Sequence, residues 1–120
     1  MNTIAIRGAI TVEENSIAAI AEATIELYEA VISANSVTEN DIVQIIFSIT
    51  KDLTKIYPAK ALREKFGLKD TPLFCVQEAD IEGSLKKCIR MLITVKSPLS
   101  KSEVKHVYLK NAQNLRPDLN

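Results

Sequence analysis

Residues 88–95, CIRMLITV, alternate in a pattern that predicts a β-strand with apolar side chains on both faces. One face would carry Ile89, Met91, Ile93 and Val95, and the other would carry Cys88, Arg90, Leu92 and Thr94. Such a strand has to be covered on both sides, because exposed apolar surface is unfavourable in water. Arg90 is the exception in the pattern. Its guanidinium indicates either an ion pair with a carboxylate at a sheet edge or a site that binds an anion in two-point geometry.

The remaining strands are predicted from alternation and from β-branched content. They are expected at residues 3–12, 41–49, 72–76 and 104–112. The segment 41–49, DIVQIIFSI, is dense in Ile, Val and Phe, so this strand should be largely buried.

Two helices are predicted between these strands. From residue 16 to residue 33 the apolar side chains recur at spacings of three and four, which is typical of a long amphipathic helix. Asn15 or Ser16 would cap its N-terminus. A second helix is expected at 58–66, because Pro58 suits the first helical position and a glycine follows the last residue.

The order β, α, β, α, β, β, β predicts an α+β fold, a mixed sheet of about five strands with two main helices on one face. Two helices cover only one side of a sheet. The other apolar side therefore needs a partner, and self-association is the economical solution. Residues 1–120 should form one domain, because the chain has the length of a single ordinary core.

Composition argues against several classes of function. Lys plus Arg equals Asp plus Glu at 15 each, so no net field draws the chain to nucleic acid or to a membrane surface. Three glycines cannot build a P-loop or a dinucleotide fingerprint, and two cysteines with one histidine are too few for structural zinc. No signal peptide or membrane-spanning segment is recognisable. We therefore expect a cytoplasmic protein without a structural zinc site or a nucleotide cofactor, and without a nucleic-acid or membrane partner.

Several cations lie near apolar structure. Arg7 is embedded in the first strand, where it also fits a solvent-facing charge, while Lys60 and Arg63 lie on one face of the second helix. Together with Arg90 they suit a dianionic small molecule.

Other candidate residues have ordinary structural interpretations. Glu78 fits a solvated loop carboxylate, Tyr108 fits a half-buried packing residue with a wet hydroxyl, and Cys75 fits a small core residue. A catalytic pair of Cys75 with His106, the only histidine, has no local support but stays open.

Four blocks of sequence extend this interpretation: IRGAITVEEN, YPAKALREKFG, CVQEADIEGSLKKCIRMLITV and HVYLKNAQNLRPDL. In combination and in this order they resemble the AroH class of chorismate mutases, nearly end to end. The resemblance implies a homotrimeric pseudo-α/β-barrel with clefts at the subunit interfaces. It also implies rearrangement of chorismate to prephenate in phenylalanine and tyrosine biosynthesis, without metal, cofactor or nucleophile.

The resemblance also implies roles for individual residues. Arg90 would stabilise the charge that develops on the ether oxygen, and Arg7 would bind a carboxylate with Tyr108 at the same end. Glu78 would accept a hydrogen bond from the ring hydroxyl, with Cys75 against it. The other cleft residues would be Phe74, Val76, Gln77, Tyr57, Ala59, Lys60, Arg63, Leu73, Leu115 and Arg116. Tyr57, Ala59, Lys60, Arg63 and Leu73 would line or approach the cleft from a neighbouring subunit, and residues 112–120 would form a tail over its mouth.

The sequence departs from the family pattern at Ile10, Tyr57, Ala79 and Asn111. None of these positions removes a proposed contact group. A different class of function, a small-metabolite-binding or imine-handling trimer of RidA-like fold, is an alternative that rests on fold analogy alone.

Overall fold

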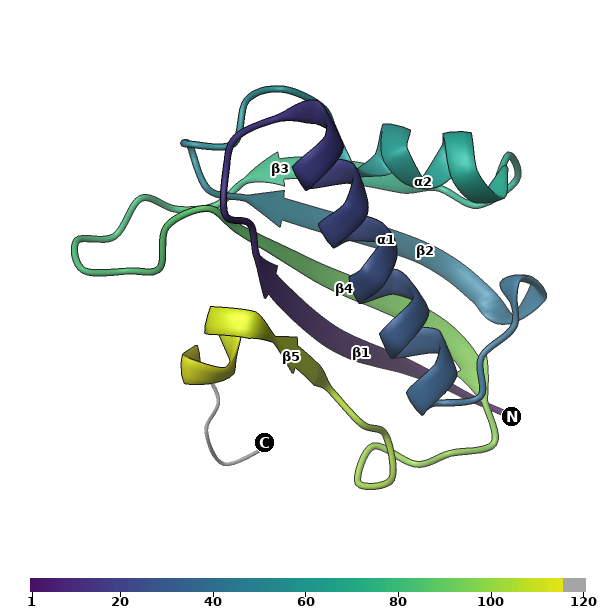
Figure 1. Cartoon of the computed structure of the whole chain (residues 1–120). Helices are drawn as coiled ribbons and strands as arrows, with labels where there is room; N and C mark the ends of the chain where they lie inside the picture. Colours follow the sequence, from purple (N-terminus) through teal and green to yellow (C-terminus); the bar gives the residue numbers. More distant parts are fainter. Residues whose placement is uncertain (116–120) are drawn as a thin grey trace.

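The computed structural model describes residues 1–115. Its elements, in chain order, are β1 (Asn2–Thr11), α1 (Ile17–Ala34), η1 (Glu39–Asp41), β2 (Ile42–Ile49), α2 (Pro58–Phe66), β3 (Leu73–Gln77), β4 (Cys88–Ser97), β5 (Val107–Leu109) and η2 (Lys110–Leu115) (Figure 1). The predicted α+β order of strands and helices is confirmed. Within the described part of the chain, no helix is long and apolar enough to cross a membrane.

All five strands belong to one mixed sheet in the order β3-β2-β4-β1-β5. β4 is the central strand and runs antiparallel to both of its neighbours, β2 and β1. The edge strands are parallel to the strands beside them, β3 to β2 and β5 to β1. β4 is therefore not at an edge, so Arg90 lies in the middle of the sheet and not at the sheet edge considered for its ion pair.

The two helices cover one face of this sheet, where they bury the main core (Figure 1). α1 begins after Ser16, whose Oγ accepts the Ala19 N–H at 3.1 Å, so Ser16 and not Asn15 is the cap. Close packing of α1 on β1 favours a glycine at position 8. A Cβ there would lie 3.0 Å from both Leu27 and Val31.

The largest difference from the predicted elements is at the C-terminal end. The strand predicted at 104–112 is confined to Val107–Leu109 and is followed by the 3₁₀ helix η2. Lys110 has a φ of 53°, which leaves the extended conformation, and Thr11 Oγ1 then accepts the Asn111 N–H at 3.1 Å. The end of β1 thus turns the chain away from the sheet. The structure describes the proposed tail, residues 112–120, only as far as Leu115, and Arg116 lies outside the described residues.

The other face of the sheet carries exposed apolar side chains. Phe74 is 64% exposed, Val76 41% and Leu92 37%. Phe74 pairs with Ile46 of β2, which in turn pairs with Leu92 of β4, so these side chains form a row across the sheet. The inference that the two helices cover only one face is confirmed.

Candidate active site

Arg90 and Glu78 form the centre of the candidate site on this uncovered face. Arg90 Nε lies 3.0 Å from Glu78 Oε1, and the Ser48 hydroxyl donates to the same oxygen at 2.7 Å. Ser48 and Arg90 are cross-strand partners on β2 and β4. Glu78 follows β3 directly, and its N–H donates to Ile49 O at 2.8 Å. The Arg90 side chain has this carboxylate partner and is still 44% exposed, so it remains open to a ligand.

A cavity of about 320 Å³ lies beside Arg90. Arg7 from β1, Tyr108 from β5 and Leu115 from η2 contribute to its lining. The small residue Ala9 pairs with Arg90 on one side and with Tyr108 on the other, which leaves space between their side chains. Two guanidinium groups at one cavity favour an anionic ligand, and their fork geometry suits a carboxylate.

The cavity wall is held by a small apolar cluster that is separate from the main core. It consists of Ala9, Cys88, Tyr108 and Ala112, with Leu85 and Leu115 packed against it. Arg7 is fixed through its backbone, because its N–H donates to Nδ1 of His106 at 2.9 Å. The histidine therefore joins β1 to the segment that leads into β5.

A second set of predicted residues lies around α2 and the edge strand β3. Tyr57 precedes α2, is 68% exposed, and lines two hollows, one with Lys60 and the other with Cys75, Val76 and Gln77. Ala59 is buried, Leu73 is half-buried, and Lys60 and Arg63 are exposed on α2. These residues belong to a region that does not include Arg7 or Arg90.

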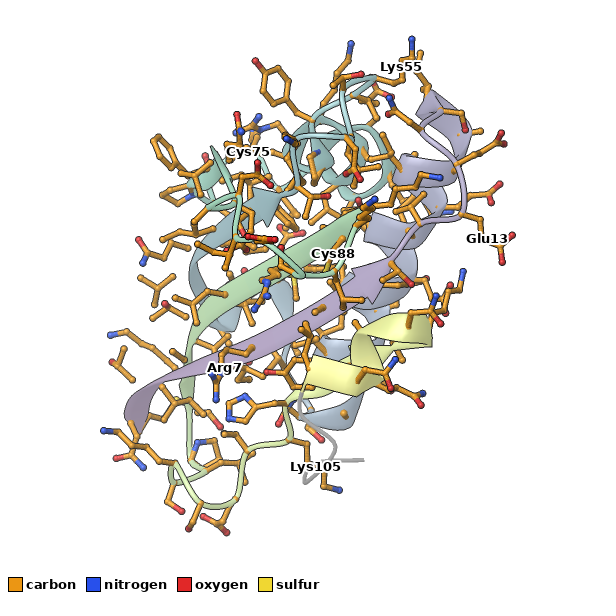
Figure 2. The ribbon with its side chains drawn as sticks, turned by 90° about the vertical axis from the view of Figure 1, so that its left-hand side faces the viewer. Arg7, Glu13, Lys55, Cys75, Cys88 and Lys105 are labelled. Carbon is orange, nitrogen blue, oxygen red and sulfur yellow. The ribbon has the colours of Figure 1, made fainter. Side chains whose placement is uncertain are left out.

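Within one chain the two sets do not meet. Figure 2 shows Arg7 and Cys75 far apart on the molecule, from β1 and β3 respectively. Cys75 packs against the helix-side core, whereas Glu78 bonds to Ser48 on the opposite face, so these two side chains are not in contact in one chain. His106 lies next to β5 and Cys75 lies in β3, at opposite edges of the sheet, which rules out the Cys–His pair within a chain.

Both thiols are held in the protonated form. Burial raises the pKa of Cys75, more than a backbone hydrogen bond at Ala59 and the charge of Arg63 lower it. Burial likewise raises the pKa of Cys88 to about 11, although the neighbouring Arg90 lowers it. Because the thiolate is the nucleophilic form, neither cysteine is suited to attack a substrate at neutral pH.

The Cys88 thiol should consequently resist alkylation. With a pKa of about 11, only about one Cys88 in ten thousand is a thiolate at pH 7. Raising the pH increases that fraction, so labelling by iodoacetamide should accelerate continuously up to pH 10. Mass spectrometry of the labelled peptides measures the rate, with the partly exposed Cys75 as an internal reference. A labelling rate that levels off below pH 9 would contradict this assignment.

Sequence reasoning did not identify six residues of the cavity lining: Gly8, Ala9, Ile46, Ser48, Met91 and Leu92. Ile46 and Ser48 lie in a segment dominated by apolar residues, and only the register of β2 against β4 reveals that they share the sheet face of Arg90. The available signal was the serine itself, a polar residue in a strand otherwise rich in Ile and Val.

The fold and the site together define a class: a small α+β protein with an arginine-lined cavity on an open sheet face. Comparison with known proteins identifies the protein family within that class. The sequence model of the family "Chorismate mutase type I" matches residues 3–119. The chain belongs to this family.

Individual relatives agree with the family match. The chain is 44% identical to the chorismate mutase AroH of Bacillus subtilis over 95% of its own length and 90% of that protein. It is 42% identical to the AroH of Thermus thermophilus over 95% and 93% of the two chains. Among solved structures it resembles a chorismate mutase from Clostridium thermocellum, with a TM-score of 0.89, 42% identity, and coverage of 92% of this chain and 98% of that one.

Proposed function

We propose that this protein converts chorismate to prephenate and that Arg90 stabilises the transition state of this rearrangement. The family membership and the two arginines at one cavity support the proposal. The single observation that carries the role of Arg90 is its position: a guanidinium on the central strand, paired through Nε and still open to the cavity. The reaction belongs to the synthesis of aromatic amino acids, and a cytoplasmic location stays a prediction.

The chemistry of the rearrangement explains why a fixed cation is useful. The ether C–O bond breaks ahead of C–C bond formation, so negative charge grows on the ether oxygen. A cation fixed beside that oxygen stabilises the transition state more than the substrate, which lowers the barrier. Glu78 Oε1 lies 3.0 Å from Arg90 Nε, and in this proposal the terminal nitrogens of the guanidinium donate to the ligand.

Other residues around Arg90 hold the substrate. Arg7 binds a carboxylate, and Tyr108 donates a hydrogen bond at the same end of the substrate. Glu78 accepts a hydrogen bond from the ring hydroxyl through its remaining oxygen. These contacts hold the enolpyruvyl arm over the ring, and such pre-orientation removes much of the entropic part of the barrier. No step requires a nucleophile, which fits the two protonated thiols.

A second copy of the chain completes the cleft in this proposal. The set around Arg63 and Cys75 is separate from the set around Arg7 and Arg90 in one chain, and the exposed row that includes Phe74 needs a cover. A homotrimer with threefold symmetry satisfies both requirements, because each subunit would offer its β3 and α2 edge to the cavity of the next. Tyr57, Ala59, Lys60 and Leu73 would then contribute from the neighbouring subunit. The alternative RidA-like function gains no support, since the named relatives are chorismate mutases.

The decisive experiment is an assay of the purified protein with chorismate. We expect loss of chorismate absorbance with formation of prephenate, and inhibition by a bicyclic dicarboxylate that mimics the transition state. The mimic should also raise the melting temperature, because a ligand that binds only the folded state stabilises it. Absence of turnover in a folded protein whose melting temperature ignores the mimic would overturn the proposal.

A further inference from the structure

Ser48 is a polar residue whose hydroxyl reaches the centre of the candidate site. It lies in β2 between the core residue Phe47 and the half-buried Ile49. Its Oγ donates to Glu78 Oε1 at 2.7 Å, and this same oxygen lies 3.0 Å from Arg90 Nε. Two donors from two different strands thus converge on one carboxylate oxygen. The Ser48 hydroxyl is bonded to Oε1, which leaves Oε2 as the second acceptor of the carboxylate.

We propose that Ser48 is a positioning residue for the Glu78 carboxylate, holding Oε1 so that Oε2 accepts a hydrogen bond from the substrate. This inference rests on the proposed function. Ser48 need not touch the substrate, since its hydroxyl acts through the carboxylate. The register of β2 against β4 places it opposite Arg90, and the Glu78 N–H bond to Ile49 O ties Glu78 to the same strand, β2.

The benefit of the arrangement lies in what it prevents. A carboxylate and a guanidinium favour two parallel hydrogen bonds, which would occupy Nε and one terminal nitrogen of Arg90 together with both oxygens of Glu78. That geometry would remove one donor from the ether oxygen and the acceptor from the ring hydroxyl. The second donor on Oε1 favours the single contact at Nε instead. Without the Ser48 hydroxyl, Glu78 is free to rotate into the two-point pair.

Deleting the Ser48 hydroxyl should affect the site and not the core. Ser48 is half-buried on the cavity side of the sheet, whereas the adjacent Phe47 fills the core on the helix side. Replacing Ser48 by alanine removes one hydroxyl and no core volume. Deleting the donor of a hydrogen bond to a charged group should lower kcat/KM about ten- to a hundredfold.

The test compares Ser48→Ala with Ser48→Thr in the full-length protein. Ser48→Ala should lower kcat/KM about ten- to a hundredfold, with a fall in kcat as well as a rise in KM, because both Arg90 and Glu78 are affected. Ser48→Thr keeps the hydroxyl in a residue that suits strands, so it should recover most of the activity. Ser97→Ala is the matched control: it deletes a strand serine on β4 outside the cavity and should leave kcat/KM within a factor of about two.

A double-mutant cycle with Glu78→Ala separates positioning from general damage. If Ser48 acts through Glu78, Ser48→Ala should have no further effect once the carboxylate is gone. Where Glu78→Ala leaves too little turnover, the same cycle is measured on binding of the bicyclic mimic by calorimetry. Additive losses in the cycle, or a Ser48→Ala enzyme with near-normal kcat/KM, would overturn the role of Ser48 while the proposed function stands. A wild-type protein that neither converts chorismate nor binds the mimic would overturn both.

Discussion

Replacing Arg90 with alanine should lower kcat by a factor on the order of 10² to 10³ or more, the loss seen when one preorganised transition-state donor is removed. The guanidinium is held at Nε by Glu78, so its orientation is set before substrate binds. Arg90→Lys should also be severely impaired, since an ammonium group lacks the planar fork and cannot bind Glu78 and the ether oxygen in the same geometry. Stopped or continuous chorismate assays under saturating substrate give kcat directly.

Two controls make this prediction decisive. Lys96→Ala removes a cation from the same strand, outside the cavity, and should leave kcat within a factor of about two. The circular dichroism spectrum and melting temperature of Arg90→Ala should match the wild type closely, because the residue is exposed on the sheet face. Near-normal turnover of Arg90→Ala would refute the assigned role.

Mixing two inactive variants should restore activity if the cleft is built from two chains. Arg90→Ala damages the cavity set, and Arg63→Ala damages the set around α2 and Cys75. When equal amounts are unfolded and refolded together, about a quarter of interfacial sites should contain both arginines by random assortment of subunits in a closed ring. Activity should therefore rise from near zero to about a quarter of the wild-type value in the same assay, by the same symmetry reasoning.

The matched control mixes Arg90→Ala with Arg7→Ala. Both of these residues line the same cavity of one chain, so no assortment of subunits produces an intact site and activity should stay low. Recovery in this control, or no recovery in the first mixture despite confirmed subunit exchange, would contradict a cleft shared between chains.

Much of the site could be predicted from the sequence because its residues stand out locally. Arg90 interrupts an apolar strand pattern, and Glu78 and Tyr108 belong to blocks that resemble the family. Ser48 could not be predicted, because its role depends on which residue lies opposite it in the sheet. Cys75 is instructive for the same reason: the resemblance places it against Glu78, yet in one chain the two side chains lie on opposite faces of the sheet.

The sequence by itself determined the order of the five strands and two main helices, the approximate bounds of both helices, and the need for a second cover on the sheet. These properties are local, because apolar spacing, caps and breakers act over a few residues. Only the tertiary structure decided that β4 is central, that β5 ends after Leu109, and that Ser48 and Arg90 share one carboxylate. Strand order and register arise from contacts between segments far apart in the chain, and a shift of one residue would turn every side chain to the other face.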